Sequence, residues 1–417
     1  MIYSLKKITL IFIKILKKEI KLKFGLPQNI EIFVYNSDSI KFLENVLEKR
    51  DYVVIDLRLN QLREIYISFK LFSIILKNIF KFNLSKNYFY GVLKIVKPKI
   101  LITSCDNHKD FFELAKLLDT DIKFMAVQNA NRSDYILNNH DFNKKIVKKN
   151  YNKEFYIPYF FCFSQNEIDN CNLYNIKVNK FYKIGSISTA NFFYYINKSQ
   201  KKIEKNKFDI CLISEPEVGI NKRYKIEGAE EGFGLVANYT IEFARKFNYR
   251  LIFASKRLKV SEPNSKTIYN QELLYNSELN FYKKYLNKNN FDYLMKNLNP
   301  KENYFSSYFA IFQSKVAVAT YTTLLRDKIG VGEKILSCNL TKSSLFDFPL
   351  NGICSIQNCS YQEFEQRLKK IMTISSDEYF KEIEKDRKYI MEFNGEYGAI
   401  NFIKNELDSI LMNKEQW

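Results

Sequence analysis

The sequence predicts an α/β protein built from two parallel, doubly wound sheets of similar size. In both halves of the chain, short apolar runs alternate with longer segments of helical periodicity, separated by polar or glycine-containing turns. This alternation is typical of strand–helix–strand units, whose parallel strands are buried on both faces. The 417 residues are enough for two such units, so we expect two Rossmann-like domains that face a cleft.

The first expected domain covers residues 26–190. Its first strand runs into the polar stretch 36–39, which is typical of a helix start. Helices are predicted over 39–49 and 109–118. The strands are predicted over 31–35, 52–56, 99–103, 123–127, 160–163 and 180–184.

The second expected domain covers residues 208–376. It follows a polar, lysine-rich segment, 191–207, which we interpret as an interdomain linker. Helices are predicted over 238–247 and 361–372, and residues 377–417 are predicted to be helical with a break near Asn394. The strands are predicted over 208–213, 250–254, 316–319, 334–336 and 351–355.

Residues 315–336 predict a complete strand–helix–strand unit, in which Gly330 and Gly332 end the helix. The helix is expected to begin at Thr320, Thr322 and Thr323. A helix N-terminus at the carboxyl end of a parallel strand binds anions well, so we predict that a nucleotide's phosphates lie here. The alternative is an ordinary unit in which the threonines only cap the helix.

The chain is strongly basic, with 65 Lys and Arg residues against 46 Asp and Glu residues and a net charge of +19. A charge of this size attracts an anionic membrane surface, nucleic acid or a phosphate-bearing substrate. The sequence contains no RRM, KH or helix-turn-helix pattern, so we expect no nucleic-acid partner.

The cysteines and histidines restrict the chemistry further. None of the seven cysteines forms a CxxC pair, and several lie in apolar runs, such as Cys211. This pattern is typical of reduced thiols in a cytoplasmic protein. Only His108 and His140 occur, so we expect no metal site, and we predict no cofactor.

Residues 1–25 predict a basic amphipathic helix. The longest uncharged run, 8–13, is far too short to span a bilayer, which needs roughly 20 residues. Apolar residues are mixed with lysines, as in helices that lie on anionic membranes, so we expect peripheral association with the inner face of the cytoplasmic membrane. The alternative is a helix packed on the body with its lysines in solvent. Residues 66–82 are a second candidate of this kind.

Several short motifs together resemble a known family. The first half carries a strand that ends in Asp-Asn, a Gln-Asn turn with a nearby arginine, and a Gly-Ser pair, at 102–107, 123–132 and 182–186. The second half carries related segments at 278–282, 306–308, 320–324 and 332–334. Over roughly residues 30–400, these resemble the bacterial surface-carbohydrate (O-antigen) biosynthesis proteins.

The resemblance implies a GT-B-like glycosyltransferase, with the acceptor mainly on the first domain and the nucleotide sugar mainly on the second. It also implies that Glu278 and Tyr308 contact the donor. Three positions depart from the family pattern. Ala130 replaces a glycine, Thr322 replaces a serine, and Asp327 replaces a glutamate that often holds the donor ribose. The shorter, offset side chain of Asp327 argues against that contact.

Candidate catalytic residues lie in predicted loops at strand ends, where ligands collect in parallel sheets. Asp106 is the predicted base, because a carboxylate can take the proton of an acceptor hydroxyl. Glu230 and Glu231 are alternative bases in an acidic loop. The alternative role of Asp106 is to cap the helix that follows it.

Candidate binding residues fall into two groups. Ser255, Lys256 and Arg257 are predicted to hold the donor phosphate, unless they form only a solvated basic loop. The residues predicted to contact the acceptor are Asn107, Gln128, Asn129 and Arg132. The alternative is that these residues only form hydrogen-bonded turns.

We therefore predict a nucleotide-sugar-dependent glycosyltransferase in surface polysaccharide assembly, including O-antigen, lipopolysaccharide or capsule. Its partners would be a nucleotide-sugar donor, a lipid-linked or oligosaccharide acceptor, and the inner-membrane surface. A polyol-phosphate transferase, a sugar epimerase of the same plan and a non-catalytic polyanion-binding scaffold are the alternatives.

Overall fold

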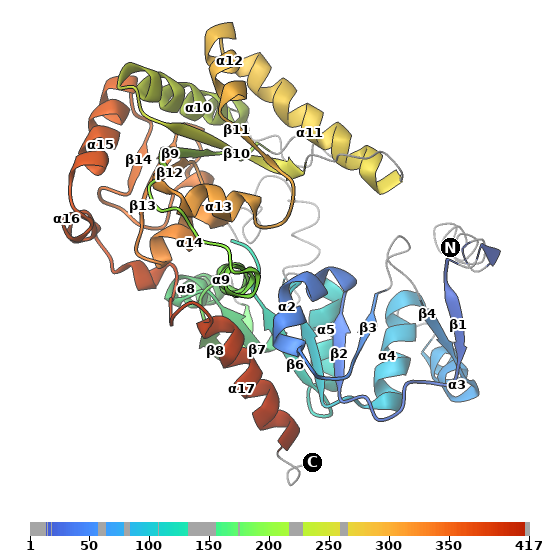
Figure 1. The fold of residues 1–417 in the computed structure, drawn as a ribbon. Helices are drawn as coiled ribbons and strands as arrows, with labels where there is room; N and C mark the ends of the chain where they lie inside the picture. The colour runs from blue at the N-terminus through green and yellow to red at the C-terminus, as the bar shows by residue number, and fades with distance from the viewer. Residues whose placement is uncertain are drawn as a thin grey trace.

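Two six-stranded parallel sheets confirm the predicted α/β architecture of two Rossmann-like domains (Figure 1). The computed structural model describes residues 14, 16–17, 19–56, 64–78, 84–106, 108–131, 156–173, 176–216, 228–258 and 266–412. Within these ranges, none of the helices is both long and apolar enough to cross a membrane.

The first sheet has the strand order β3-β2-β5-β6-β7-β8. Its inner strands are apolar and buried on both faces because helices cover both sides, which is why they were predictable. The strand order reverses between β2 and β5, which places the domain's crevice at their carboxyl ends. The strands are β2 (Ile32–Tyr35), β3 (Tyr52–Ile55), β5 (Ile100–Thr103), β6 (Lys123–Val127), β7 (Tyr156–Cys162) and β8 (Lys177–Lys183).

Helices pack on this sheet, and a separate two-stranded parallel sheet of β1 (Lys21–Phe24) and β4 (Glu64–Ile67) lies at one edge of the domain (Figure 1). The helices are η1 (Ser37–Ser39), α2 (Ile40–Leu47), α3 (Phe69–Lys77), α4 (Leu84–Val96), α5 (Lys109–Leu118), α8 (Gln165–Leu173) and α9 (Ile187–Ser199).

The second sheet has the order β11-β10-β9-β12-β13-β14, with its reversal between β9 and β12. This is the order of the six-stranded dinucleotide-binding fold. The strands are β9 (Phe208–Ile213), β10 (Leu251–Leu258), β11 (Leu298–Lys301), β12 (Ser314–Ala319), β13 (Lys334–Asn339) and β14 (Ser355–Gln357).

The helices of the second half pack around this sheet, except for the last one, which lies against the first domain (Figure 1). They are α10 (Ala229–Lys246), α11 (Lys266–Tyr285), α12 (Lys288–Lys296), α13 (Ser306–Phe312), α14 (Thr323–Gly330), η2 (Ser344–Phe346), α15 (Tyr361–Thr373), α16 (Ser376–Lys381), η3 (Arg387–Tyr389) and α17 (Gly398–Met412). The unit predicted over 315–336 is present as β12, α14 and β13.

Several predicted segments differ from the structure. The last strand, predicted over 351–355, is β14 at Ser355–Gln357, and the predicted acidic loop with Glu230 and Glu231 is the start of helix α10. The second candidate for a surface helix, 66–82, begins in strand β4, and helix α3 starts only at Phe69.

Residues 21–24, expected as the end of a helix, form strand β1, because they pair with β4 from Lys21 opposite Glu64 to Phe24 opposite Ile67. The expected linker 191–207 begins inside helix α9, because Phe192 and Phe193 are buried in the core that α9 shares with the second domain. Lys198 lies in the last turn of the helix, and the other lysines that suggested a linker follow it, at 201, 202, 205 and 207.

The C-terminal segment crosses from the second domain back to the first. The Glu392 N–H donates to the Phe163 carbonyl at 3.0 Å, and a side chain at Gly185 (φ +77°) would place its Cβ 2.1 Å from the Glu392 carbonyl oxygen. Helix α17 then packs on α2 and α9, and it buries Ile400, Ile403 and Leu407 in the first domain's core.

A buried ion pair joins the two domains where this segment crosses. The guanidinium of Arg326 on α14 donates to both oxygens of Glu167 on α8, at 2.8 and 3.0 Å. It also donates to the Asn131 side-chain oxygen at 2.5 Å and to the Ile390 carbonyl at 2.8 Å. Arg326 is fully buried and Glu167 nearly so, so each charge depends on the other for compensation.

Replacing Arg326 with methionine is expected to lower the free energy of unfolding by about 3–5 kcal/mol, because the buried Glu167 carboxylate loses its countercharge. Chemical denaturation followed by circular dichroism measures the change. A second substitution, Glu167→Leu, is expected to recover part of the loss because it removes the unpaired charge.

The matched control is Lys370→Met, which removes the exposed ion pair of Lys370 with Glu382. It is expected to cost at most about 1 kcal/mol. If Arg326→Met cost no more than this control, the pair would not have the stabilising role inferred from its burial.

Candidate functional site

The carboxyl ends of β9 and β12 form the crevice of the second domain, where the strand order reverses. The turn from β12 into α14, where the sequence predicts a nucleotide's phosphates, holds a carboxylate of the chain itself. Glu215, which follows β9, accepts the backbone N–H groups of Thr320 and, at 2.5 Å, Tyr321. The Lys256 ammonium donates to the Glu215 carbonyl at 3.0 Å, so a cation also lies beside this residue.

Burial raises the pKa of the Glu215 carboxyl to about 7, although the N–H groups of Thr320 and Tyr321 and the charge of Lys256 act in the opposite direction. The carboxyl therefore changes charge near neutral pH. Titratable groups with pKa values in this range, placed at a crevice, are typical of functional sites.

The three threonines of the turn have structural contacts. Thr322 is the N-cap of α14 and accepts the Leu324 N–H at 3.4 Å. The Thr323 hydroxyl accepts the Asn131 N–H from the first domain at 2.8 Å, and the Thr320 carbonyl accepts the Ser337 hydroxyl at 2.5 Å. These contacts favour the capping role over direct phosphate binding for Thr322, and they assign Thr323 to the domain junction.

Cations gather next to this turn, at the ends of β10 and β11. The N–H groups of Lys256 and Arg257 donate to the two oxygens of the buried Glu278 carboxylate, at 2.7 and 2.8 Å. Lys256 and Arg257, expected in a loop, belong to the last part of strand β10, and Glu278, predicted as a donor contact, holds their backbone in place. Ser255 accepts the Lys301 N–H at 2.9 Å, which ties this part of β10 to β11.

The side chain of Lys301 belongs to the same cluster of cations. Burial lowers its pKa, the Glu278 carboxylate raises it, and the charges of Lys41, Arg257 and Lys256 lower it further. Because Lys41 lies in the first turn of α2 in the first domain, positive charge from both domains meets at this point. We refer to Lys41, Lys256, Arg257 and Lys301 as the basic cluster.

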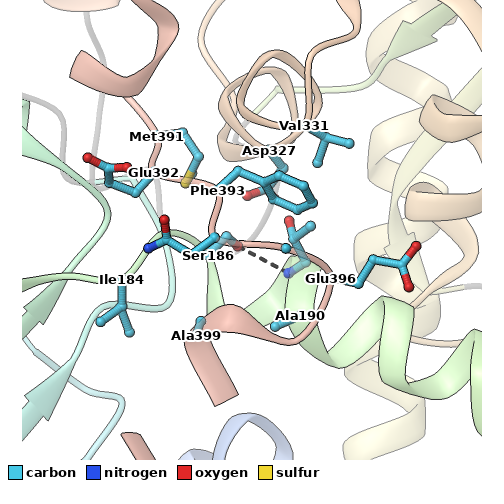
Figure 2. A pocket seen from close by; sticks show the side chains of 13 residues that line it. Ile184, Ser186, Ala190, Asp327, Val331, Met391, Glu392, Phe393, Glu396 and Ala399 are labelled. Carbon is cyan, nitrogen blue, oxygen red and sulfur yellow. Dashed lines mark hydrogen bonds between the residues drawn. The ribbon is translucent and has the colours of Figure 1, made fainter. Parts of the chain in front are cut away.

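Asp327 lines a small cavity at the domain junction (Figure 2). The buried Tyr308 hydroxyl donates to Asp327 at 2.8 Å. Burial raises the pKa of Asp327 to about 6, opposed by hydrogen bonds from Ser186, Tyr308 and Thr189. The cavity holds about 10 Å³, whereas small-molecule pockets hold roughly 300 Å³ or more, so this cavity is too small for a nucleotide.

The candidates of the first domain lie at the ends of β5 and β6. Asp106 is almost completely buried just after β5, and nearby His108 shares a hydrogen bond of 2.8 Å with the Tyr35 hydroxyl. Gln128 is fully buried; its oxygen accepts the Phe163 N–H at 2.9 Å and its amide donates to the Ala130 carbonyl at 3.2 Å. Gln128 therefore shapes the turn, the alternative considered for it.

The remaining predicted residues are distributed differently. Asn129 lies in the same turn as Gln128 and is partly exposed, while Asn107 and Arg132 lie outside the described residues. Glu230 and Glu231 are exposed in the first turn of α10, where Glu230 accepts the Tyr285 hydroxyl at 3.1 Å. Glu230 is therefore directed toward α11 on the surface of the second domain.

The sequence did not lead us to predict Glu215, Asn131 or Lys301 as site residues. Glu215 follows a predicted strand, as Asp106 does, and that position could have marked it as a candidate. Asn131 and Lys301 gain their importance from partners that are remote in sequence, such as Thr323 for Asn131, and no local pattern marks such pairs.

We expect Glu215→Gln to remove part of the pH dependence of stability. The wild-type carboxyl has a pKa of about 7 when folded and 4.5 ordinarily, so the folded state holds the extra proton between these values and the free energy of unfolding falls as the pH rises through them. The full difference corresponds to about 3 kcal/mol, and partial exposure of Glu215 should reduce it to about 2 kcal/mol.

Urea denaturation at about pH 5 and about pH 8 measures this slope. Glu302→Gln, at an exposed glutamate, is the control and should leave the slope unchanged. Equal slopes for wild type and Glu215→Gln would show that the Glu215 carboxyl does not titrate in this range.

No protein-family model and no curated protein matches the sequence. Among solved structures, the wall teichoic acid polymerase TagF is similar over all of both chains, at 8% identity and a TM-score of 0.51, and a variant of that enzyme gives 9% and 0.50. The UDP-GlcNAc 2-epimerase of Neisseria meningitidis, bound to UDP-GlcNAc, gives 12% identity and a TM-score of 0.48 over 92% of this chain and 99% of that one. The chain thus has the GT-B-like fold of two Rossmann-like domains.

Proposed function

We propose that this protein is a nucleotide-sugar-dependent glycosyltransferase of surface polysaccharide biosynthesis, of the O-antigen, lipopolysaccharide or capsule type. The observation that carries the proposal is the basic cluster at the carboxyl edge of the second sheet, to which the first domain contributes Lys41. In a fold of two Rossmann-like domains, this edge is where ligands bind.

The chemistry of glycosyl transfer suits such a cluster. An acceptor hydroxyl attacks the anomeric carbon of the donor, the bond to the diphosphate oxygen breaks, and the nucleoside diphosphate leaves with the negative charge. Fixed cations stabilise that charge as it develops, and arginine and lysine are the usual phosphate partners. In the proposal, Lys256, Arg257 and Lys301 hold the diphosphate.

Glu215 has a positioning role in this proposal. It orders the turn between β12 and α14, and its carboxylate repels a second anion from the N–H groups of Thr320 and Tyr321. The donor phosphates would therefore lie toward the lysines at β10 and β11.

The acceptor would bind on the first domain, near the ends of β5 and β6. Asp106 is the proposed base, since it lies at the carboxyl end of β5 beside the strand reversal of that sheet. We propose a lipid-linked acceptor and peripheral location at the inner face of the cytoplasmic membrane. The nucleotide sugar is a substrate, so the proposal includes no cofactor.

Nucleotide binding is the first expectation. In a thermal-shift panel of CMP, CDP, UDP, GDP and dTDP, one nucleotide at about 100 times its Kd should stabilise the wild type by roughly 2.7 kcal/mol. Lys256→Met and Lys301→Met should each weaken its binding by about tenfold or more, because each removes a charge-assisted contact with phosphate. Lys288→Met, at an exposed lysine of α12, is the matched control and should leave the affinity unchanged.

The products distinguish the proposal from its rivals. With donor and acceptor present, glycosyl transfer adds a sugar without phosphate to the acceptor and releases a nucleoside diphosphate, or CMP from a CMP-sugar. Transfer of a polyol phosphate adds phosphate to the acceptor and releases a nucleoside monophosphate, so the phosphate content of the product separates the two reactions. An epimerase changes the sugar without an acceptor. If no nucleotide shifted the melting temperature, the nucleotide-sugar proposal would be wrong and a polyanion-binding scaffold would take its place.

A further inference from the structure

Exposed apolar side chains concentrate at one edge of the first domain, on β1, β4 and α3 (Figure 1). Among the described residues, Phe69 and Phe24 are the most exposed large hydrophobic side chains, at 98% and 85%. We call this surface the apolar edge. Its members are Leu22, Phe24, Ile67, Phe69, Phe72 and Leu76.

The small sheet directs its apolar face outward. Side chains alternate along a strand, so Leu22 and Phe24 share one face of β1 and its lysines share the other. In the register, Phe24 lies opposite Ile67, and both are exposed. Tyr66, on the other face, is buried, and its N–H donates to the Tyr88 hydroxyl on α4 at 2.7 Å. The face of the small sheet that packs on α4 is therefore the one with Lys23 and Tyr66, and the face with Phe24 and Ile67 is directed outward.

Helix α3 shows the same arrangement. Its inner side is anchored by Leu71, which is buried. Phe69, Phe72 and Leu76 are spaced as i, i+3 and i+7, which places them on one stripe of the helix, and all three are exposed. An exposed stripe of large apolar side chains is uncommon on a monomer and marks an interaction site.

Charge identifies the partner. The described residues in the ranges 14, 16–17, 19–24 and 64–78 include six lysines (Lys14, Lys17, Lys21, Lys23, Lys70 and Lys77) and two glutamates. Both glutamates are already paired, Glu19 with Lys14 at 3.5 Å and Glu64 with Lys23 at 2.8 Å. Apolar side chains surrounded by lysines are complementary to an anionic lipid surface, where the rings enter the acyl boundary and the ammonium groups meet the headgroups.

We propose that the apolar edge docks this protein on an anionic membrane, with Phe24, Phe69 and Phe72 inserted at the interface. This inference deepens the membrane location in the proposed function and assigns it to folded elements. The surface belongs to the domain proposed to bind the acceptor, so docking would bring a lipid-linked acceptor close to that domain.

Vesicle co-sedimentation of the full chain tests the proposal. Binding is expected to vesicles of phosphatidylcholine and phosphatidylglycerol in equal parts, to be much weaker with phosphatidylcholine alone, and to fall as salt is raised. Phe69→Ser with Phe72→Ser should weaken binding by about tenfold or more, since two large apolar side chains no longer enter the interface. Because both are exposed, the melting temperature should not change.

Two matched controls accompany these variants. Leu117→Ser with Leu173→Ser removes exposed leucines of α5 and α8, outside the apolar edge, and should leave binding unchanged. Lys70→Gln with Lys77→Gln should weaken binding by roughly fivefold per lysine, whereas Lys288→Gln with Lys381→Gln, in the second domain, should have little effect.

Three outcomes would overturn the proposal. Equal binding of the wild type and the Phe69→Ser/Phe72→Ser variant would assign membrane binding to other residues, and equal binding to neutral and anionic vesicles would remove the role of charge. A wild-type dimer in sedimentation that the same variant dissociates, without vesicle binding, would identify a second copy as the partner. The vesicle assay contains no nucleotide and the thermal-shift panel contains no lipid, so failure of one leaves the other intact.

Discussion

The requirement that a buried charge be compensated determines how the two domains meet. Arg326 is fully buried at the start of the second domain's α14, and its countercharge, Glu167, is on the first domain. The same guanidinium contacts Asn131 in the turn after β6 and the Ile390 carbonyl in the C-terminal segment. One side chain therefore joins three parts of the chain that are distant in sequence, and it links the two domains.

Electrostatics also organises the crevice of the second domain. A helix N-terminus attracts negative charge, and here Glu215 supplies it. The cations at β10 and β11 surround a second buried carboxylate, Glu278, whose oxygens are both used by backbone N–H groups. Each carboxylate shapes a loop, and the lysine side chains remain the groups with chemistry suited to phosphate. The acidic residues thus fix the shape of the backbone in this crevice, and the basic residues supply its positive charge.

The sequence predicts the central strands well for a physical reason. Parallel strands covered on both faces must be continuously apolar, so β2, β5, β9 and β12 are visible as short apolar runs. Strand β1 lacks this signal because all four of its residues are exposed, and its lysines and apolar residues are typical of a surface helix as well. The polar, lysine-rich composition of 191–207 suggested a linker. The segment instead begins in helix α9, and Phe192 and Phe193 of that helix are buried in the core.

The candidate site was predictable to the level of strand ends, but not to the level of contacts. The positions of Asp106 and of the basic loop follow from the rule that ligands collect at carboxyl ends of parallel strands. The hydrogen bonds that make Gln128 a turn residue and Tyr308 a partner of Asp327 depend on packing between separate elements. Asn131 and Thr323 are separated by 192 positions, and only the closed fold brings them together.

The return of α17 to the first domain affects how the protein is made. All strands of the second sheet, and the helices α15 and α16 that contribute to its core, lie before residue 382, so that domain can assemble once this stretch has left the ribosome. The strands of the first domain emerge earlier, but part of its core, including Ile400, Ile403 and Leu407, is synthesised after the second domain. During translation the apolar surface of α2 and α9 that α17 covers therefore stays exposed until α17 has been made, and the first domain is completed after the second.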